Sequence, residues 1–215
     1  MSLTIRIASD FICPWCYIGE RRLQHAIARL PAGTEVVLQW LPYELNPEMR
    51  PEGAARKAYR SAKFGSWERS QAMDAQTVLA SSGDGLAFDY GAIEKTPNTF
   101  LAHRLVWLAQ RYGQATPMAQ ALLSAYFAQG RDIGAPLVLT EIAVENGLPR
   151  AEVEAFLSGD EGRSAVREAE QALQLAGVRG VPYFDIEGEV VTGAQSAEAL
   201  HEALVRALNK TTATH

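Results

Sequence analysis

The sequence predicts an α/β fold in which a small mixed core is interrupted by a large, all-helical insertion. Runs rich in β-branched residues occur near the two ends of the chain, within about residues 3–42 and 181–192. From about residue 48 to 177, alanine, leucine and charged residues dominate instead. Because β-branched residues favour strands and the second composition favours helices, we expect a discontinuous core of residues 1–47 and 178–215. Residues 48–177 are the expected insertion.

The N-terminal part of this core is a predicted strand–helix–strand unit. Residues 3–8 alternate polar and apolar side chains and are rich in β-branched residues, which favours a strand. Residues 14–30 carry apolar side chains at helical spacing. Pro14 suits the first position of that helix, because its missing N–H would be unpaired there. Cys13 is then the N-cap residue, and residues 35–42 predict the second strand.

Turn and cap residues divide the insertion into helices. Thr96-Pro97 and Thr116-Pro117 are each interpreted as an N-cap followed by the first helical residue. Glycines and the Asn146-Gly147 pair mark helix ends. The expected helices are residues 54–64, 67–80, 97–111, 117–129, 136–145, 149–157 and 160–176.

Strand character returns at the C-terminal end. Residues 181–186 and 190–192 flank Glu187-Gly188-Glu189, which predicts a β-hairpin. Ser196 is the expected N-cap of a last helix that ends at Leu208. Residues 209–215 are polar and are expected to be a frayed tail.

The chain has two cysteines, Cys13 and Cys16, separated by Pro14 and Trp15 at the expected start of the first helix. A helix N-terminus presents unpaired N–H groups and a partial positive charge, which favour an anion such as a thiolate. Cys13 is therefore the candidate nucleophile. Cys16 lies one turn further, so it is the candidate resolving thiol of a thiol–disulfide redox site.

Three other interpretations of the cysteine pair remain open. A zinc site needs further ligands, usually a second cysteine pair or closely spaced histidines. The four histidines are scattered, so no metal site is expected. A structural disulfide would close too short a loop to constrain the unfolded chain much. Two inert core thiols would leave the proline between them at a helix start without a reason.

Composition narrows the class of protein and its compartment. The net charge of −5 and the lack of a basic cluster argue against a general nucleic-acid binder. No apolar run approaches the length of a membrane span. Arg6 and Asp10 interrupt any secretory signal at the N-terminus. With its two cysteines in one motif, the chain has no disulfide framework for an oxidising compartment, so we expect it in the cytoplasm.

Five segments of the sequence are similar to one family. They are residues 11–19 (FICPWCYIG), 40–47 (WLPYELNP), 98–105 (NTFLAHRL), 180–184 (GVPYF) and 193–196 (GAQS). In these segments the chain resembles the DsbA-like thioredoxin superfamily, specifically its FrnE-like cytoplasmic branch. The resemblance implies a thioredoxin-like core with the helical insertion between its second and third strands. It also implies thiol–disulfide exchange through C-P-W-C, without a metal or organic cofactor.

The resemblance implies a substrate site beside the cysteines. In the family, the peptide bond that matches Val181-Pro182 is cis and faces the C-x-x-C motif, although trans is commoner for X-Pro bonds in general. The backbone of Val181 is then presented to a substrate and pairs with an extended peptide or with glutathione as a short β-ladder. The implied partners are thiol- or disulfide-containing proteins or small molecules, with glutathione as the redox partner.

Related members point to a second enzyme class. Kappa-class glutathione transferases and 2-hydroxychromene-2-carboxylate isomerases share this architecture, bind glutathione and typically have serine in place of Cys13. In them, the start of the last helix holds the γ-glutamyl end of glutathione. Gln195 and Ser196 match those positions, although Gln195 is an amide where an acidic residue is usual. The alternative function is therefore a glutathione-dependent isomerase or transferase that acts on an aromatic or polyketide-like molecule.

Asn46, His103 and Arg104 are weaker candidates for substrate contact. Trp15 is expected to be exposed beside Cys13 and, with Pro14, to pack on the substrate. His103 lies on a mostly apolar helix, where a structural histidine is the usual explanation, but it matches the family pattern and can titrate near neutral pH. Asn46 is expected to shape a turn. An insertion this apolar is also consistent with a homodimer.

Overall fold

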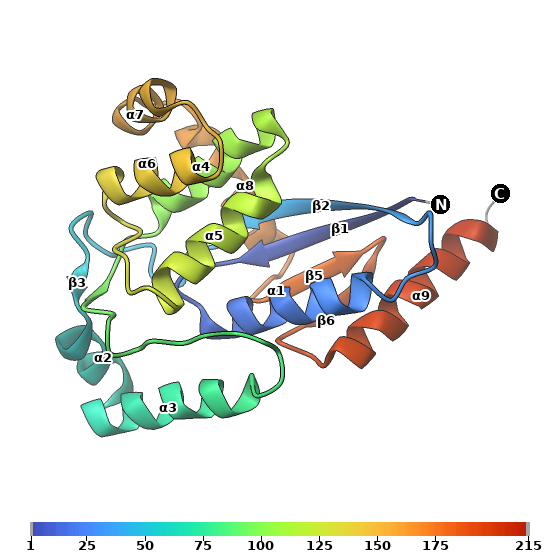
Figure 1. Cartoon of the computed structure of the whole chain (residues 1–215), viewed down its shortest axis with the longest axis horizontal. Coiled ribbons are helices and arrows are strands. Elements are labelled where there is room, and N and C mark those ends of the chain that lie inside the picture. The colour runs from blue at the N-terminus through green and yellow to red at the C-terminus, as the bar shows by residue number, and fades with distance from the viewer. Residues whose placement is uncertain (1, 214–215) are drawn as a thin grey trace.

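A four-stranded mixed sheet lies at the centre of the computed structural model, which describes residues 2–213 and the side chains of residues 2–210 (Figure 1). Its strand order is β2-β1-β5-β6. The pair β1–β2 is parallel, and the pairs β1–β5 and β5–β6 are antiparallel. The bounds of the strands are β1 Ser2–Ser9, β2 Glu35–Pro42, β5 Tyr183–Ile186 and β6 Glu189–Thr192.

The central strand β1 shows why this sheet forms. Leu3, Ile5 and Ile7 alternate along β1 and are almost fully buried. Ile5 is in register with Leu38 of β2 and with Ile186 of β5. Alternate apolar residues place one face of the sheet on the core, as the alternation in the sequence predicts.

Helices account for most of the segment between β2 and β5. The 3-10 helix η1 is Gln110–Tyr112, and a two-stranded ribbon joins β3 Ala54–Ala55 to β4 Lys95–Thr96. The α-helices are α1 Pro14–Ile27, α2 Arg56–Phe64, α3 Trp67–Ala80, α4 Phe100–Ala109, α5 Ala115–Phe127, α6 Pro136–Glu145, α7 Arg150–Ser158, α8 Arg163–Leu175 and α9 Ala197–Ala213.

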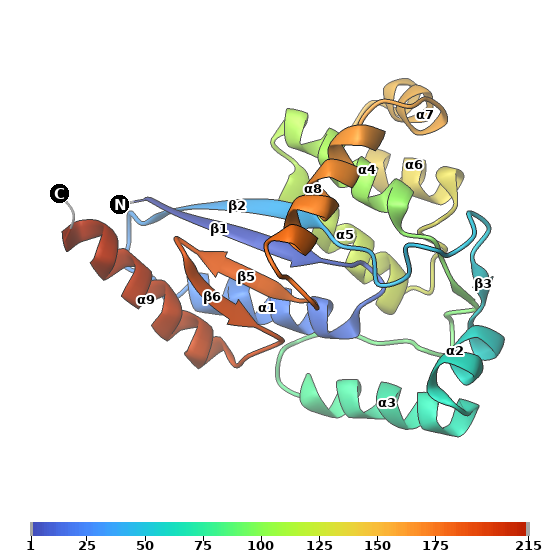
Figure 2. The same cartoon turned by 180° about the vertical axis from the view of Figure 1, so that it is seen from behind.

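The helices cover both faces of the sheet (Figures 1 and 2). Helices α1 and α9 pack side by side on one face, and α8 lies against β2 on the other. One continuous hydrophobic cluster includes Leu3 of β1, Leu123 of α5, Leu139 of α6 and Leu204 of α9. The helical segment thus shares its core with the sheet. The pair α2–α3 projects past the end of α1 that carries the cysteines (Figure 1).

Two of the expected helix N-caps, Thr96 and Thr116, are wrong. Thr96 is not an N-cap; it pairs with Ala54 in the short ribbon. Helix α4 begins at Phe100, because the side chain of Asn98 accepts a hydrogen bond from the Phe100 N–H and donates one to the carbonyl of Met49. Helix α5 begins one residue before the expected cap, at Ala115. The hydroxyl of Thr116 instead accepts a hydrogen bond from the indole of Trp40, at 3.0 Å.

The ends of the first and last helices also differ from expectation. Helix α1 ends at Ile27, before Pro31. Helix α9 continues to Ala213, so residues 209–213 are helical rather than a frayed tail; residues 214–215 lie outside the described part of the chain. Arg206 and Lys210 both pair with Glu189 of β6, which holds the last turns against the sheet.

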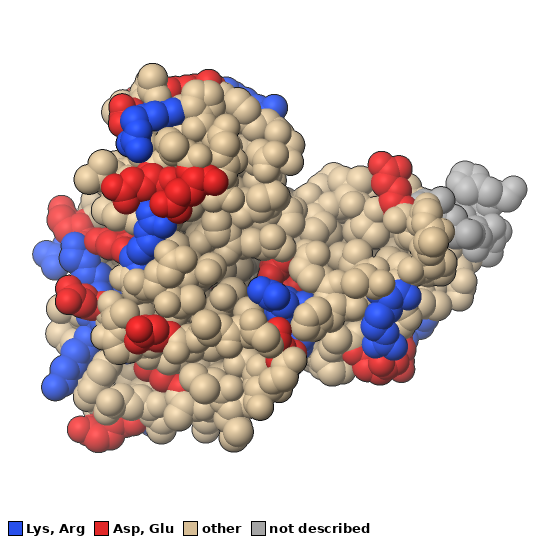
Figure 3. Space-filling view, in the orientation of Figure 1, with Lys and Arg blue, Asp and Glu red and all other residues tan. Residues whose placement is uncertain are grey.

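The surface of the described chain is mixed in charge. On the face shown in Figure 3, basic and acidic side chains are interspersed, with broad uncharged areas between them. Within residues 2–213, no helix is both long and apolar enough to cross a bilayer. The division into two domains at residues 47 and 178 stays a prediction, since the helical segment and the sheet share one core.

Candidate active site

Cys13 is the N-cap residue of α1, with Pro14 at the first helical position. Its backbone is extended (φ −91°, ψ 111°). Its N–H donates to the carbonyl of Asp10 at 3.0 Å, and its carbonyl accepts from the N–H of Cys16 at 3.0 Å. This geometry starts the helix at Pro14 as the sequence predicts. The C-x-x-C motif therefore lies at the positive end of the helix dipole, which favours negative charge there.

The loop that precedes β5 faces the motif. The Val181–Pro182 peptide bond is cis, the isomer that the family resemblance implies. The Sγ atom of Cys13 lies 3.8 Å from the carbonyl oxygen of Val181. Because Tyr183 pairs with Ala8, the strand pairing β1–β5 brings this loop and the motif together from opposite ends of the chain.

The two thiols have different environments. Both are buried, and both are free rather than joined as a disulfide. Cys16 is buried, and burial raises its pKa well above the ordinary value; a hydrogen bond to Cys13 and the charge of Cys13 raise it further. The hydroxyl of Ser9 and the backbone N–H of Asp10 act in the opposite direction. Cys16 thus retains its proton in the dithiol state, and Cys13 is the thiol available for a first attack.

A cleft of about 290 Å³ opens beside Cys13. One wall comes from the motif, from Val181 and from the turn after β2. The opposite wall comes mainly from α2 and α3, which project past the motif (Figure 1). Trp15 lies at this cleft with 39% of its surface exposed. The lining also includes Pro14, Leu45, Asn46, Tyr59, Arg60, Lys63, Phe64, Met73, Asp74, Thr77 and Tyr126.

A polar cluster joins the two walls of the cleft. Asn46, in the turn after β2, accepts hydrogen bonds through Oδ1 from the hydroxyl of Tyr59 and from the ammonium of Lys63, the latter at 2.6 Å. Lys63 Nζ also lies 3.2 Å from the Tyr59 hydroxyl. Asn46 therefore holds a cation beside the cleft.

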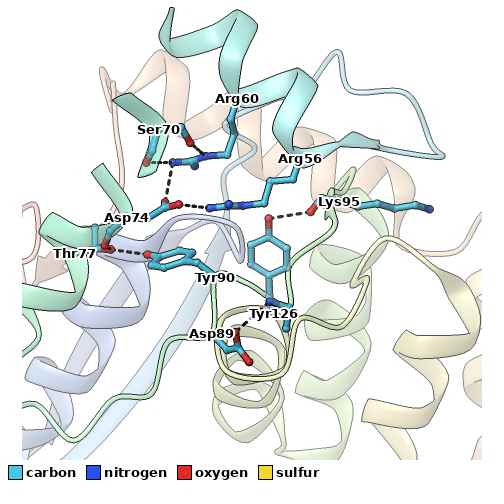
Figure 4. A network of polar contacts seen from close by, with 10 residues as sticks. Arg56, Arg60, Ser70, Asp74, Thr77, Asp89, Tyr90, Lys95 and Tyr126 are labelled. Atoms are coloured by element: carbon cyan, nitrogen blue, oxygen red, sulfur yellow. Dashed lines mark hydrogen bonds and ion pairs between the residues drawn. The ribbon is translucent and has the colours of Figure 1, made fainter. Parts of the chain in front are cut away.

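A charge network stiffens the wall formed by α2 and α3 (Figure 4). Asp74 of α3 accepts from Arg56 at 2.6 Å and from Arg60 at 2.9 Å. Arg56 also lies 5.5 Å from the centre of the Trp67 ring and 5.2 Å from that of Tyr90. Desolvation by burial lowers the pKa of Arg60, and the charge of Arg56 adds to this effect.

Not all predicted site residues lie at the cleft. Ser196 caps α9, where its hydroxyl accepts from the N–H of Ala199 at 3.1 Å. The side-chain amide of Gln195 donates to the carbonyl of Thr192 at 2.9 Å. Both residues are exposed, and neither lines the cleft. Their role in substrate binding stays a prediction.

His103 lies behind the motif rather than in the cleft. It is 5% exposed, and its ring centre is 4.8 Å from that of Phe11. Its Nε2 atom lies 3.6 Å from Oδ1 of the buried Asp10. His103 is not among the residues that line the cleft beside Cys13, and its contact with a substrate stays a prediction.

The sequence reasoning missed the residues that α2 and α3 contribute to the cleft. Tyr59 and Lys63 are four residues apart on α2, so they share one face of that helix. The spacing alone could have grouped them. The spacing does not say which way this face of α2 points, because its direction depends on how α2 and α3 pack beside the motif.

Comparison with known proteins supports the structural reading. Residues 4–205 match the model of the DSBA-like thioredoxin domain family. The chain belongs to this family. Its architecture is thus the thioredoxin-like DsbA fold with a helical insertion, as the sequence predicts.

Solved structures of three proteins place this DSBA-like chain among its relatives. A probable DsbA oxidoreductase from Streptomyces coelicolor is 32% identical with a TM-score of 0.87, covering 96% of this chain and 90% of that one. A 2-hydroxychromene-2-carboxylate isomerase is 15% identical with a TM-score of 0.75, covering 99% of both chains. The cytosolic disulfide reductase DsbM from Pseudomonas aeruginosa, solved with glutathione, is 21% identical with a TM-score of 0.65. The match covers 99% of this chain and 100% of the DsbM chain. The last two likenesses show the fold alone.

Gly19 of α1 allows the loop before β5 to approach the motif helix. A Cβ atom at this position would lie 2.9 Å from Pro182 Cγ and 3.2 Å from Phe184 Cζ. We expect Gly19→Ala to lower the free energy of unfolding by about 1–2 kcal/mol, because overpacking outweighs the gain in helix propensity. Denaturant titration measures this. Gly180→Ala, with open space around its Cβ, is the matched control, and equal stability of the two variants would contradict the prediction.

Proposed function

We propose that this protein is a thiol–disulfide oxidoreductase in which Cys13 is the nucleophile and Cys16 the resolving thiol. The observation that carries the proposal is the asymmetry of the pair. Both thiols are buried, but Cys13 lines the cleft at the N-terminus of α1, whereas Cys16 does not line it and retains its proton. The DsbA-like family to which the chain belongs supports the same chemistry.

The proposed exchange has two steps. In the reducing direction, the thiolate of Cys13 attacks one sulfur of a substrate disulfide. A bond forms between Cys13 and that sulfur, the substrate disulfide breaks, and the released thiolate takes a proton from solvent. Cys16 then loses its proton and attacks Cys13, so that the Cys13–Cys16 disulfide forms and the second substrate thiol leaves. Two electrons pass to the substrate; the reverse sequence oxidises a dithiol.

The residues around the cleft are suited to binding a substrate that has an extended backbone and a carboxylate. The backbone of Val181 stands beside Cys13 and can pair with an extended peptide or with glutathione. Along the opposite wall, Lys63 and Arg60 carry two positive charges against the one negative charge of Asp74. Glutathione has carboxylates and an extended shape, and DsbM was solved with it. We propose glutathione or a thiol-containing peptide as the redox partner, and a cytoplasmic location like that of DsbM.

A redox titration tests the proposal. The purified protein is equilibrated across ratios of reduced to oxidised glutathione, alkylated, and weighed by mass spectrometry. We expect Cys13 and Cys16 to switch together between dithiol and disulfide, and the midpoint shows which direction of exchange is favoured. If both thiols stay reduced throughout while intact glutathione remains bound non-covalently, disulfide exchange is not the function.

That second result would favour the alternative, a glutathione-dependent isomerase or transferase. The observation behind it is the likeness in fold to 2-hydroxychromene-2-carboxylate isomerase over nearly the whole of both chains. In such an enzyme the thiol of bound glutathione is the nucleophile, and Cys13 positions or activates it. Cys16 counts against this class, because that chemistry needs no resolving thiol.

A further inference from the structure

A second group of buried polar side chains lies near the C-P-W-C motif, and none of them lines the cleft. Asp10 comes from the loop after β1, Glu44 from the turn after β2 and His103 from α4. Their side chains are 0%, 1% and 3% exposed. Asp10 Oδ2 accepts a hydrogen bond from the N–H of Leu45 at 2.7 Å, which fixes the carboxylate beside His103.

Three atoms of this group have no hydrogen-bond partner within the described chain. They are Asp10 Oδ1, Glu44 Oε1 and His103 Nε2. Asp10 Oδ1 and His103 Nε2 are 3.6 Å apart, which is beyond a good hydrogen bond. Burying such atoms without partners is costly. Because three such atoms occur together beside a redox motif, we look for a function that explains them.

A cavity of about 180 Å³ brings His103 of this group together with Ser9, the residue before Asp10. Both Ser9 and His103 line the cavity, together with Phe11 and Trp40. Within the described part of the chain, Ser9 Oγ has no nitrogen or oxygen atom as a hydrogen-bond partner. Its hydroxyl instead interacts with the sulfur of Cys16 and lowers the pKa of that thiol. A cavity of this size, to which Ser9 and His103 contribute polar side chains, has room for water molecules that bridge them.

We propose that His103 accepts, through cavity water and the Ser9 hydroxyl, the proton that Cys16 loses when it resolves the mixed disulfide. The inference rests on the proposed function and adds an internal base to it. The proton passes from the Cys16 thiol to the imidazole, the Cys16 thiolate attacks Cys13, and the substrate thiolate leaves. In the opposite direction, the imidazolium returns the proton to Cys16. No electrons move through the path, and no metal is involved.

The charges around His103 suit this role. An imidazole nitrogen can accept a proton, and the Asp10 carboxylate, with Oδ1 3.6 Å from His103 Nε2, would stabilise the imidazolium. Glu44 also faces His103, and Arg167 and Glu170 of α8 face Glu44. Burial, followed by the charge of Glu170, raises the pKa of Glu44 to about 7. Glu44, Arg167 and Glu170 line a surface pocket, which gives the proton a way out to solvent.

Stopped-flow reaction of the reduced protein with the aromatic disulfide DTNB separates the two steps. Attack by Cys13 releases the first thionitrobenzoate, and resolution by Cys16 releases the second. We expect His103→Gln and Ser9→Ala to leave the first phase within about twofold of wild type. They should slow the second phase about tenfold at neutral pH. Its rate should then rise more steeply with pH, because hydroxide in solvent replaces the internal base.

The controls separate this inference from the function on which it rests. His25→Gln removes an exposed histidine of α1 and should change neither phase. If the second phases of both test variants match wild type at every pH, or if both phases slow equally, the proton path is wrong. Should His103→Gln fail to fold, Ser9→Ala decides by the same criteria. If wild type itself shows no second phase, the proposed dithiol function fails instead.

Discussion

Cys13→Ser is expected to abolish disulfide exchange, whereas Cys16→Ser is expected to stop it halfway, with the substrate held on Cys13. A serine hydroxyl forms no disulfide, so the first substitution removes the acceptor of the covalent bond. The second removes the thiol that breaks this bond. Turnover of a disulfide substrate should fall by roughly 10³-fold or more in both variants, although for different reasons.

Mass spectrometry distinguishes the two failures. After incubation with oxidised glutathione, Cys16→Ser should carry one glutathione on Cys13, and Cys13→Ser should carry none on the buried Cys16. Thermal unfolding of both variants shows whether each is folded before the masses are compared. Stable modification of Cys16 in the Cys13→Ser variant would reverse the assigned roles.

The same variants discriminate between the two enzyme classes. A glutathione-dependent isomerase should keep much of its activity in Cys16→Ser, because a second thiol takes no part in that chemistry. A disulfide oxidoreductase should lose its turnover in Cys16→Ser, because it needs the second thiol to release the substrate. The outcome depends on the chemistry of Cys16, which the fold alone does not decide, since both classes share this architecture.

The sequence predicts the core and the motif because their signals are local. Pro14 between two cysteines specifies a helix start, and the β-rich run of residues 35–42 specifies a strand; both occur in the structure with these bounds. Helix α3 likewise has the expected bounds, Trp67–Ala80, since Ser66 caps it. In each case the residues that determine the element lie within it or next to it.

The cleft depends on tertiary contacts that no local pattern carries. Tyr59 and Lys63 reach the site because α2 packs beside the motif and Asn46 bonds both of them. Thr96 looks like a helix cap, but pairing with Ala54 overrides that local preference. His103 lies on an apolar helix, and only the packing of α4 against the β1–α1 loop shows that it faces Asp10.

Asp74→Asn is expected to destabilise the protein by about 3–5 kcal/mol, because it leaves two arginines without their shared counter-charge. The Asp74 side chain is 9% exposed, and those of Arg56 and Arg60 are 4% and 17% exposed. Asparagine keeps one oxygen that accepts from one guanidinium, but its amide group donates and cannot accept from the other. Ser70 still accepts from Arg60 at 2.6 Å, so Arg56 bears most of the cost.

The loss should appear in the free energy of unfolding from denaturant titration. Asp160→Asn is the matched control, because the Asp160–Arg163 pair is exposed and should contribute less than about 1 kcal/mol. The wall of α2 and α3 should also loosen, so that KM for oxidised glutathione rises while the DTNB reactivity of Cys13 is unchanged. Stability within about 1 kcal/mol of wild type would show that Asp74 does not hold the wall. An equal loss of Cys13 reactivity would show that the wall and the motif are not separable parts of the site.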